Sequence, residues 1–105
     1  MRIEDTQDQV KIILESQSER DHVDVFIRAL NLYSQRRRER GNDGWRRYGY
    51  KGAAFFIKDR SNRLWDSVQL KRTIHENDVL DIMNYAVFCI RSHREDNYGG
   101  EFWPS

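Results

Sequence analysis

The sequence predicts an all-α protein, a compact four-helix single domain with a central apolar helix. Four stretches carry apolar residues at helical rather than alternating spacing. The only proline is Pro104, so no proline interrupts these stretches. At 105 residues, 38% of them apolar, the chain fits one domain whose core is economical or shared with a second copy. We therefore expect residues 1–105 to form one domain, and we expect a homo-oligomer.

The first two stretches are a short helix and a long one. We expect a helix over residues 7–17, because Thr6 and Gln9 have the spacing of a capping box. Residues 1–17 are then a docking arm. The second helix begins near Ser18 or Asp21 and ends by Gly41. Its narrow apolar seam consists of Val23, Phe26, Leu30 and Tyr33.

The other two stretches contain most of the expected core. The third helix opens around Gly52, and one of its faces carries Ala53, Phe56, Ile57, Leu64 and Val68. The fourth, residues 75–94, is apolar nearly all round, which is typical of a central, buried helix. Residues 95–105 follow as a tail that is flexible or docked on its own fold or on a neighbour, because exposed aromatic residues are costly.

The charges are segregated along the chain although the net charge is only +1. Residues 34–51 hold 7 basic and 2 acidic groups, whereas residues 75–105 hold 2 basic and 6 acidic groups. A basic middle folded against an acidic helix forms a polar seam, and phosphates bridged by metal satisfy both signs. Plain intramolecular ion pairing explains the same segregation. Because the whole chain is nearly neutral, a nucleic-acid partner is not expected.

The sequence also bears on compartment and metal type. No apolar signal core appears in residues 1–10, and no run approaches the roughly 20 apolar residues of a membrane span. We therefore expect a cytoplasmic protein, in the host cytoplasm if a phage encodes it, with no membrane partner. No Cys or His pair has the spacing of zinc ligands, and the single Cys89 lies in the most apolar stretch.

Polar side chains form one contiguous stripe along the fourth helix. Its members, which fall within one angular sector, are Asn77, Asp78, Asp81, Asn84 and Tyr85. Buried carboxylates need a cation or a proton. Asp78 and Asp81 lie at i and i+3, so together they can hold one divalent cation such as Mg²⁺. Alternatively, cations of the third helix neutralise them in a structural salt bridge; the candidates are Lys58, Arg60 and Arg63.

The connection between the second and third helices is rich in glycine, arginine and aromatic residues. Residues 41–52 include four glycines together with Trp45, Arg46 and Arg47. Glycine permits close backbone approach, arginine binds phosphate through two hydrogen bonds, and an aromatic ring can stack on a base. The other interpretation is a plain helix connection in which Trp45 and Tyr48 cover the end of the core.

The order of these features resembles a known family. Gly44-Trp45, Gly49, Gly52, the segment 58–64 and the segment 78–86 together are similar to the nucleotide modification associated domain family 1 of bacteriophages and bacteria. That family is similar in turn to the all-α MazG-like nucleoside triphosphate pyrophosphatases. The resemblance covers roughly residues 22–94, and its most specific part is the Asp-x-x-Asp-x-x-Asn-Tyr pattern from Asp78 to Tyr85.

The resemblance implies roles for individual residues. Asp78 and Asp81 would hold Mg²⁺ that activates water, and Arg46, Lys58 or Arg63 would stabilise the developing phosphate charge. One departure stands out. The pyrophosphatases carry a second acidic pair on the preceding helix, where this chain offers only Asp59 and Asp66, at a spacing unlike Glu-x-x-Glu.

The sequence thus leaves three functions open. The first is a nucleotide-binding, Mg²⁺-dependent pyrophosphohydrolase with Asp78 and Asp81 as its catalytic and metal-binding residues. The second is a binder that only sequesters a nucleotide-derived ligand. The third is a structural interaction protein whose acidic stripe is salt-bridged. The candidate ligand-binding residues are Trp45, Arg46, Arg47, Lys58, Arg63, Asn84 and Tyr85.

Overall fold

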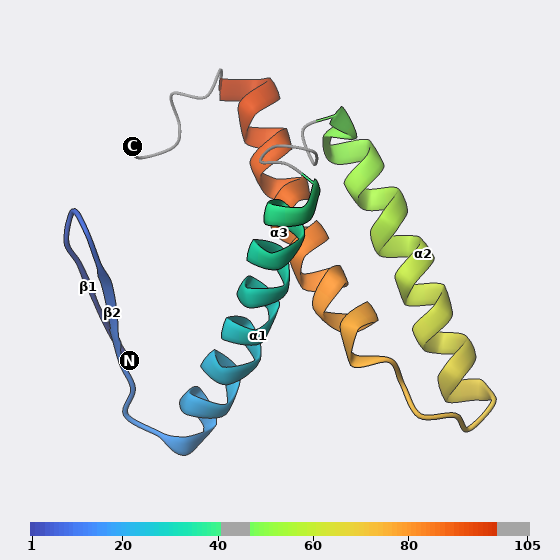
Figure 1. Ribbon diagram of the computed structural model, residues 1–105, viewed down its shortest axis with the longest axis horizontal. Helices are drawn as coiled ribbons and strands as arrows, with labels where there is room; N and C mark the ends of the chain where they lie inside the picture. Colours follow the sequence, from blue (N-terminus) through green and yellow to red (C-terminus); the bar gives the residue numbers. More distant parts are fainter. Residues whose placement is uncertain (41–46, 99–105) are drawn as a thin grey trace.

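The computed structural model describes residues 1–40 and 47–98, which are predominantly helical as predicted (Figure 1). Over these ranges the chain forms an N-terminal β-hairpin and three helices rather than four. The elements are β1 (Arg2–Asp5), β2 (Val10–Ile13), α1 (Gln17–Arg40), α2 (Gly49–Gln69) and α3 (Glu76–Tyr98). Across the described ranges, none of the helices is long and apolar enough to cross a membrane.

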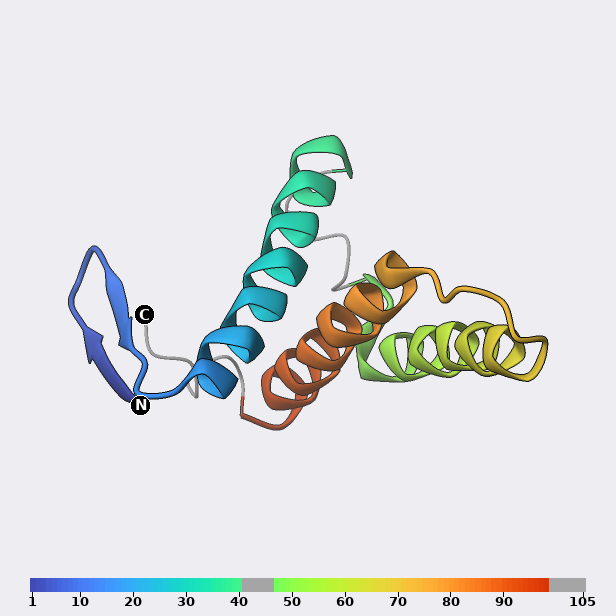
Figure 2. The ribbon, with the colours of Figure 1, turned by 90° about the horizontal axis from the view of Figure 1, so that it is seen from below.

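The predicted helix over residues 7–17 is wrong, because this segment belongs to the hairpin and its exit. The backbone N–H of Thr6 donates to the carbonyl of Gln9 at 2.8 Å, and the N–H of Gln9 donates to the Thr6 hydroxyl at 3.2 Å. Thr6 and Gln9, which were predicted to form a helix cap, therefore close the turn of the hairpin. Ile3 pairs with Ile12 across the antiparallel strands. In both views the hairpin stands apart from the helices (Figures 1 and 2).

Helix α1 begins at Gln17, close to the expected Ser18, and its capping box is formed by Ser16 and Glu19. The N–H of Glu19 donates to the Ser16 hydroxyl at 3.1 Å, and the Glu19 carboxylate accepts from the Ser16 N–H at 3.0 Å. This reciprocal pair satisfies backbone donors that a helix start leaves free. The helix then runs to Arg40 and crosses α3.

Helices α2 and α3 form an antiparallel pair, and α3 contacts both other helices (Figure 2). The predicted ranges of these two helices are confirmed to within a few residues. Two small or medium side chains are buried there, Ala53 of α2 and Leu80 of α3. Helix α3 is therefore central in its contacts.

The expectation that α3 is buried all round is wrong. Its acidic stripe faces α1 and α2 and Leu80 is buried, but part of the apolar side faces outward, where Val87 and Ile90 are about half exposed. Among the described residues only Ala29, Ala53 and Leu80 form a buried apolar core. The radius of gyration, 15.9 Å, exceeds the roughly 13 Å expected for a compact domain of this length.

Candidate functional site

Asp78 lies at the start of α3 and is paired with α2. The Arg63 guanidinium donates to its carboxylate, with Nη2 and Oδ1 2.9 Å apart. Asp78 is buried, whereas the Arg63 side chain is 55% exposed. This ion pair is one of those predicted from the sequence, and it gives the carboxylate the positive partner that burial demands.

Asp81, one turn later, is paired with the other neighbouring helix. Nη1 of Arg36 in α1 lies 2.6 Å from its Oδ1. The Asp81 side chain is 7% exposed and that of Arg36 is 31% exposed. Arg36 was not among the cations predicted to neutralise the stripe. Its position at i+7 from Ala29 and i+3 from Tyr33, on the face of α1 that packs on α3, is the signal that could have found it.

The next two members of the stripe also contact protein groups. The side-chain amide of Asn84 donates to the carbonyl of Ala29 in α1 at 2.9 Å. The ring of Tyr85 stacks on Phe56 of α2, with centroids 5.0 Å apart and planes inclined by 19°. Together with the two aspartates, these residues therefore join α3 to α1 or α2 at four positions of the stripe.

Arg60 of α2 lies beside this aromatic stack. Its guanidinium carbon is 5.6 Å from the ring centroids of both Phe56 and Tyr85, within range of a cation–π interaction. Its Nη1 donates to Asp59 at 2.8 Å, while its buried Nε has no hydrogen-bond partner. Arg60 thus covers the edge of the stack, and it does not reach the stripe carboxylates that it was one candidate to neutralise.

The remaining predicted ligand-binding residues do not gather at the stripe. Lys58 is exposed, and it precedes Arg60 by two residues, about 200° round a helix, so it projects from the side of α2 opposite α3. Arg47 is exposed just before α2. Trp45 and Arg46 lie outside the described residues, as does the aromatic end of the tail.

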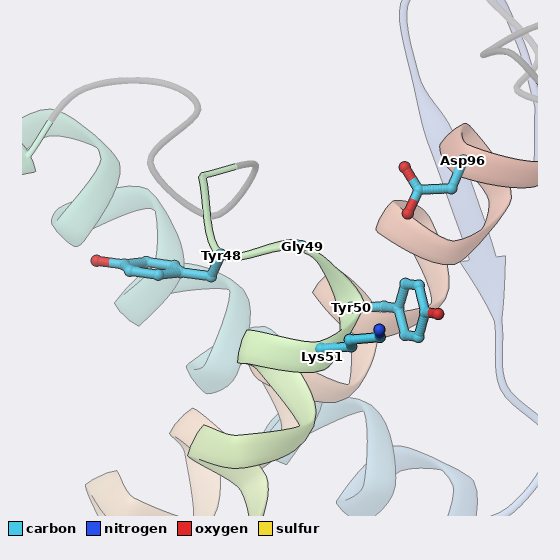
Figure 3. Close-up of a pocket in the computed structure, with 5 residues that line it drawn as sticks. All are labelled: Tyr48, Gly49, Tyr50, Lys51 and Asp96. Carbon is cyan, nitrogen blue, oxygen red and sulfur yellow. The ribbon is translucent and has the colours of Figure 1, made fainter.

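A pocket of about 340 Å³ opens at the start of α2, lined by Tyr48, Gly49, Tyr50, Lys51 and Asp96. Tyr50 and Lys51 point to the side where Asp96 of α3 lies, whereas Tyr48 points away from them (Figure 3). Gly49 has a φ of 63°, a backbone conformation that favours glycine. Four of its five lining residues belong to the glycine- and arginine-rich segment, residues 41–52, for which the composition predicted ligand binding.

The stripe carboxylates that were expected to hold Mg²⁺ are paired with arginines. One oxygen of each carboxylate, Oδ1, contacts Arg63 in Asp78 and Arg36 in Asp81. Mg²⁺ demands a near-octahedral set of oxygen ligands. The described part of the chain holds no group of three or more His, Cys, Asp or Glu side chains that could supply one.

The comparisons with known proteins add no relative. The sequence matches no protein-family model, and searches of curated proteins and of solved structures find no match. The resemblance to the nucleotide modification associated family therefore stays a prediction that rests on the motif alone.

Proposed function

We propose that this chain is a helical interaction protein that works as a homo-oligomer, the third function that the sequence left open. The observation that carries the proposal is the orientation of α3. Its carboxylates are turned inward and paired with Arg36 and Arg63, while part of its apolar side, at Val87 and Ile90, is turned outward. A helix that is apolar nearly all round is stable only when that side is covered too.

The other helices support the same proposal. Large apolar side chains are more than half exposed on α1 and on α2, among them Phe26, Leu30, Phe55 and Trp65. Such extended apolar surface is typical of a protein–protein interface. Self-association gives these faces a partner without invoking a second protein.

Protein concentration is the variable that tests this proposal. If the fold depends on association, the melting temperature rises with protein concentration, because mass action favours the assembled state. We expect a measurable rise over a hundredfold concentration range in differential scanning calorimetry. A melting temperature that is independent of concentration would argue for a self-sufficient monomer and against the proposal.

Nucleotide binding is the second candidate, and the pocket at the start of α2 favours it. Lys51 offers a cation for phosphate, and Tyr50 offers a ring for stacking. Here the ligand would bind at the helix start, away from the acidic stripe, without a step through Mg²⁺. The motif resemblance, which implies a nucleotide ligand, is the other support for this candidate.

A thermal-shift screen with and without Mg²⁺ tests the second candidate. A nucleotide at 100 times its dissociation constant adds about 2.7 kcal/mol to stability. Lys51→Met should abolish that shift, and Lys58→Met, about 10 Å further along the same helix and outside the pocket, should preserve it. Loss with Lys58→Met instead would favour the phosphate contact implied by the resemblance. Release of pyrophosphate would identify an enzyme, and a screen without any shift would remove this candidate.

A further inference from the structure

Four side chains form an apolar stripe on α1 that α3 does not cover. The face of α1 toward α3 is marked by Ala29, Tyr33 and Arg36, which contact Asn84, Phe88 and Asp81 respectively. The uncovered apolar side chains, here called the outer stripe, lie roughly a quarter turn round the helix from that face. It consists of Val23, Phe26, Ile27 and Leu30.

The outer stripe is exposed along its length. Phe26, Ile27 and Leu30 are 56%, 50% and 59% exposed, and Val23 is partly exposed. Their spacing, i, i+3, i+4 and i+7, is that of a helix seam that packs against another helix. The hairpin does not cover it, because the hairpin stands apart from the helices in both views (Figures 1 and 2).

The exposed area is enough for a stable dimer. The chain exposes 8518 Å², whereas a compact monomer of its mass, 12.7 kDa, exposes about 6,200 Å². The excess is about 2,300 Å² per chain. A stable protein–protein interface buries about 800 Å² on each partner, so the excess accommodates such an interface.

We propose that α1 packs antiparallel against α1 of a second copy through the outer stripe, about a twofold axis between Phe26 and Ile27. This inference rests on the proposed self-association and names its surface and its symmetry. In this arrangement Val23 lies opposite the partner's Leu30, and Phe26 lies opposite the partner's Ile27. Every member of the outer stripe is then covered by another member, as an isologous interface requires.

The charges of α1 favour the antiparallel orientation over the parallel one. Residues 17–28 hold 3 acidic and 2 basic groups, and residues 29–40 hold 1 acidic and 4 basic groups. An antiparallel pair places the acidic half of each helix beside the basic half of the other. A parallel pair places the two basic halves side by side, and like charges at close range oppose association.

Cross-linking between single cysteines tests both the surface and the orientation. In a Cys89→Ala background, Val23→Cys and Leu30→Cys proteins of different tag length are mixed, allowed to exchange and mildly oxidised. We expect the mixed 23–30 disulfide, because these positions face each other across the axis. Links between two copies of Val23→Cys should be absent, because seven residues separate the facing positions by about 10 Å along the helix, beyond disulfide reach.

The outcomes separate this inference from the proposed self-association. Preferential 23–23 and 30–30 links would show a parallel pair and overturn the inference. An oligomer by sedimentation that gives links only from Ile90→Cys on α3 would also overturn it, while leaving self-association intact. A monomer at every concentration would overturn both.

A substitution within the outer stripe gives an independent measurement. Phe26→Asp should raise the dissociation constant of the oligomer at least tenfold with unchanged helical circular dichroism, because the residue is exposed in the single chain. Gln35→Glu, exposed about 130° round α1 from the centre of the outer stripe, adds the same charge and should change association far less. Equal effects of the two substitutions would contradict the outer stripe as the contact.

Discussion

Arg36 of α1 and Asp81 of α3 form an ion pair with 2.6 Å between Nη1 and Oδ1, although 45 positions separate them in the sequence. One turn earlier on α3, Asp78 is paired with Arg63 of α2. Two carboxylates on one helix thus bind the other two helices. The polar side of α3 therefore connects the three helices. The exposed part of its apolar side, at Val87 and Ile90, is available for association.

Asp81→Asn should destabilise the chain. The amide keeps the shape of the side chain but leaves the Arg36 charge without its counterion. A fully buried pair broken in this way costs about 3–5 kcal/mol. Because Arg36 is partly exposed and can regain water, we expect the lower value of about 1.5–3 kcal/mol that a hydrogen bond to a charged group contributes.

Urea denaturation measures this loss against a matched control. Asp66→Asn makes the same chemical change at an exposed position of α2 and should stay within about 0.5 kcal/mol of the unmodified protein. Unchanged stability of Asp81→Asn, combined with lost Mg²⁺-dependent nucleotide binding, would instead support the metal-binding role that the motif resemblance implies.

Asn84→Ala tests the second connection between α1 and α3. The substitution removes the hydrogen bond from the Asn84 amide to the carbonyl of Ala29. The expected cost is about 1 kcal/mol, the net value of a typical intramolecular hydrogen bond. Asn62→Ala, at an exposed position of α2, serves as the control. Equal denaturation midpoints for the two variants would show that this contact does not hold α1 in place.

The junction between the hairpin and α1 should respond to pH at both ends of the range. Hydrogen bonding to Glu19 raises the pKa of the Met1 amino group, and the backbone N–H of Glu15 followed by that amino group lowers the pKa of Glu19. The contribution of the raised amine is present below its unfolded pKa and is lost as pH rises through its folded value. The contribution of the depressed carboxyl is present above its unfolded pKa and is lost as pH falls through its folded value.

Amide chemical shifts measure this response locally. The N–H groups of Glu15 and Ser16 donate to Glu19, so their signals should titrate in acid together with that carboxyl. Because these groups are exposed, the melting temperature of the helices should hardly follow. If these amide chemical shifts do not change with pH in the acid range, the hydrogen bonds from Glu15 and Ser16 to the Glu19 carboxylate do not form in solution.

Gly49→Ala should destabilise the start of α2 through the backbone alone. Gly49 has a φ of 63°, where a Cβ costs roughly 1–2 kcal/mol. The added methyl group itself would have room, since the nearest atom, Ser92 Oγ, is 3.8 Å away. Thermal denaturation measures the cost. A variant as stable as the unmodified protein would mean that this residue does not need a left-handed conformation.

The three helices could be predicted because each has its own periodic pattern. The hairpin could not, since Thr6 and Gln9 at i and i+3 satisfy a helix start and a β-turn equally well. The pairing of Asp78 with Arg63 was among the expected alternatives because α2 and α3 are neighbours in sequence. The partner of Asp81 was missed because Arg36 belongs to a basic run, residues 36–40, at the end of a helix. Cations are favoured at a helix C-terminus whatever they contact.

Sedimentation equilibrium of the intact chain tests the central claim most directly. A self-associating protein should show a molar mass that rises with concentration toward a whole multiple, at least twice, of the 12.7 kDa chain. At the highest concentrations the outward face of α3 and the outer stripe would then be covered. A mass of one chain throughout the micromolar to millimolar range would contradict self-association.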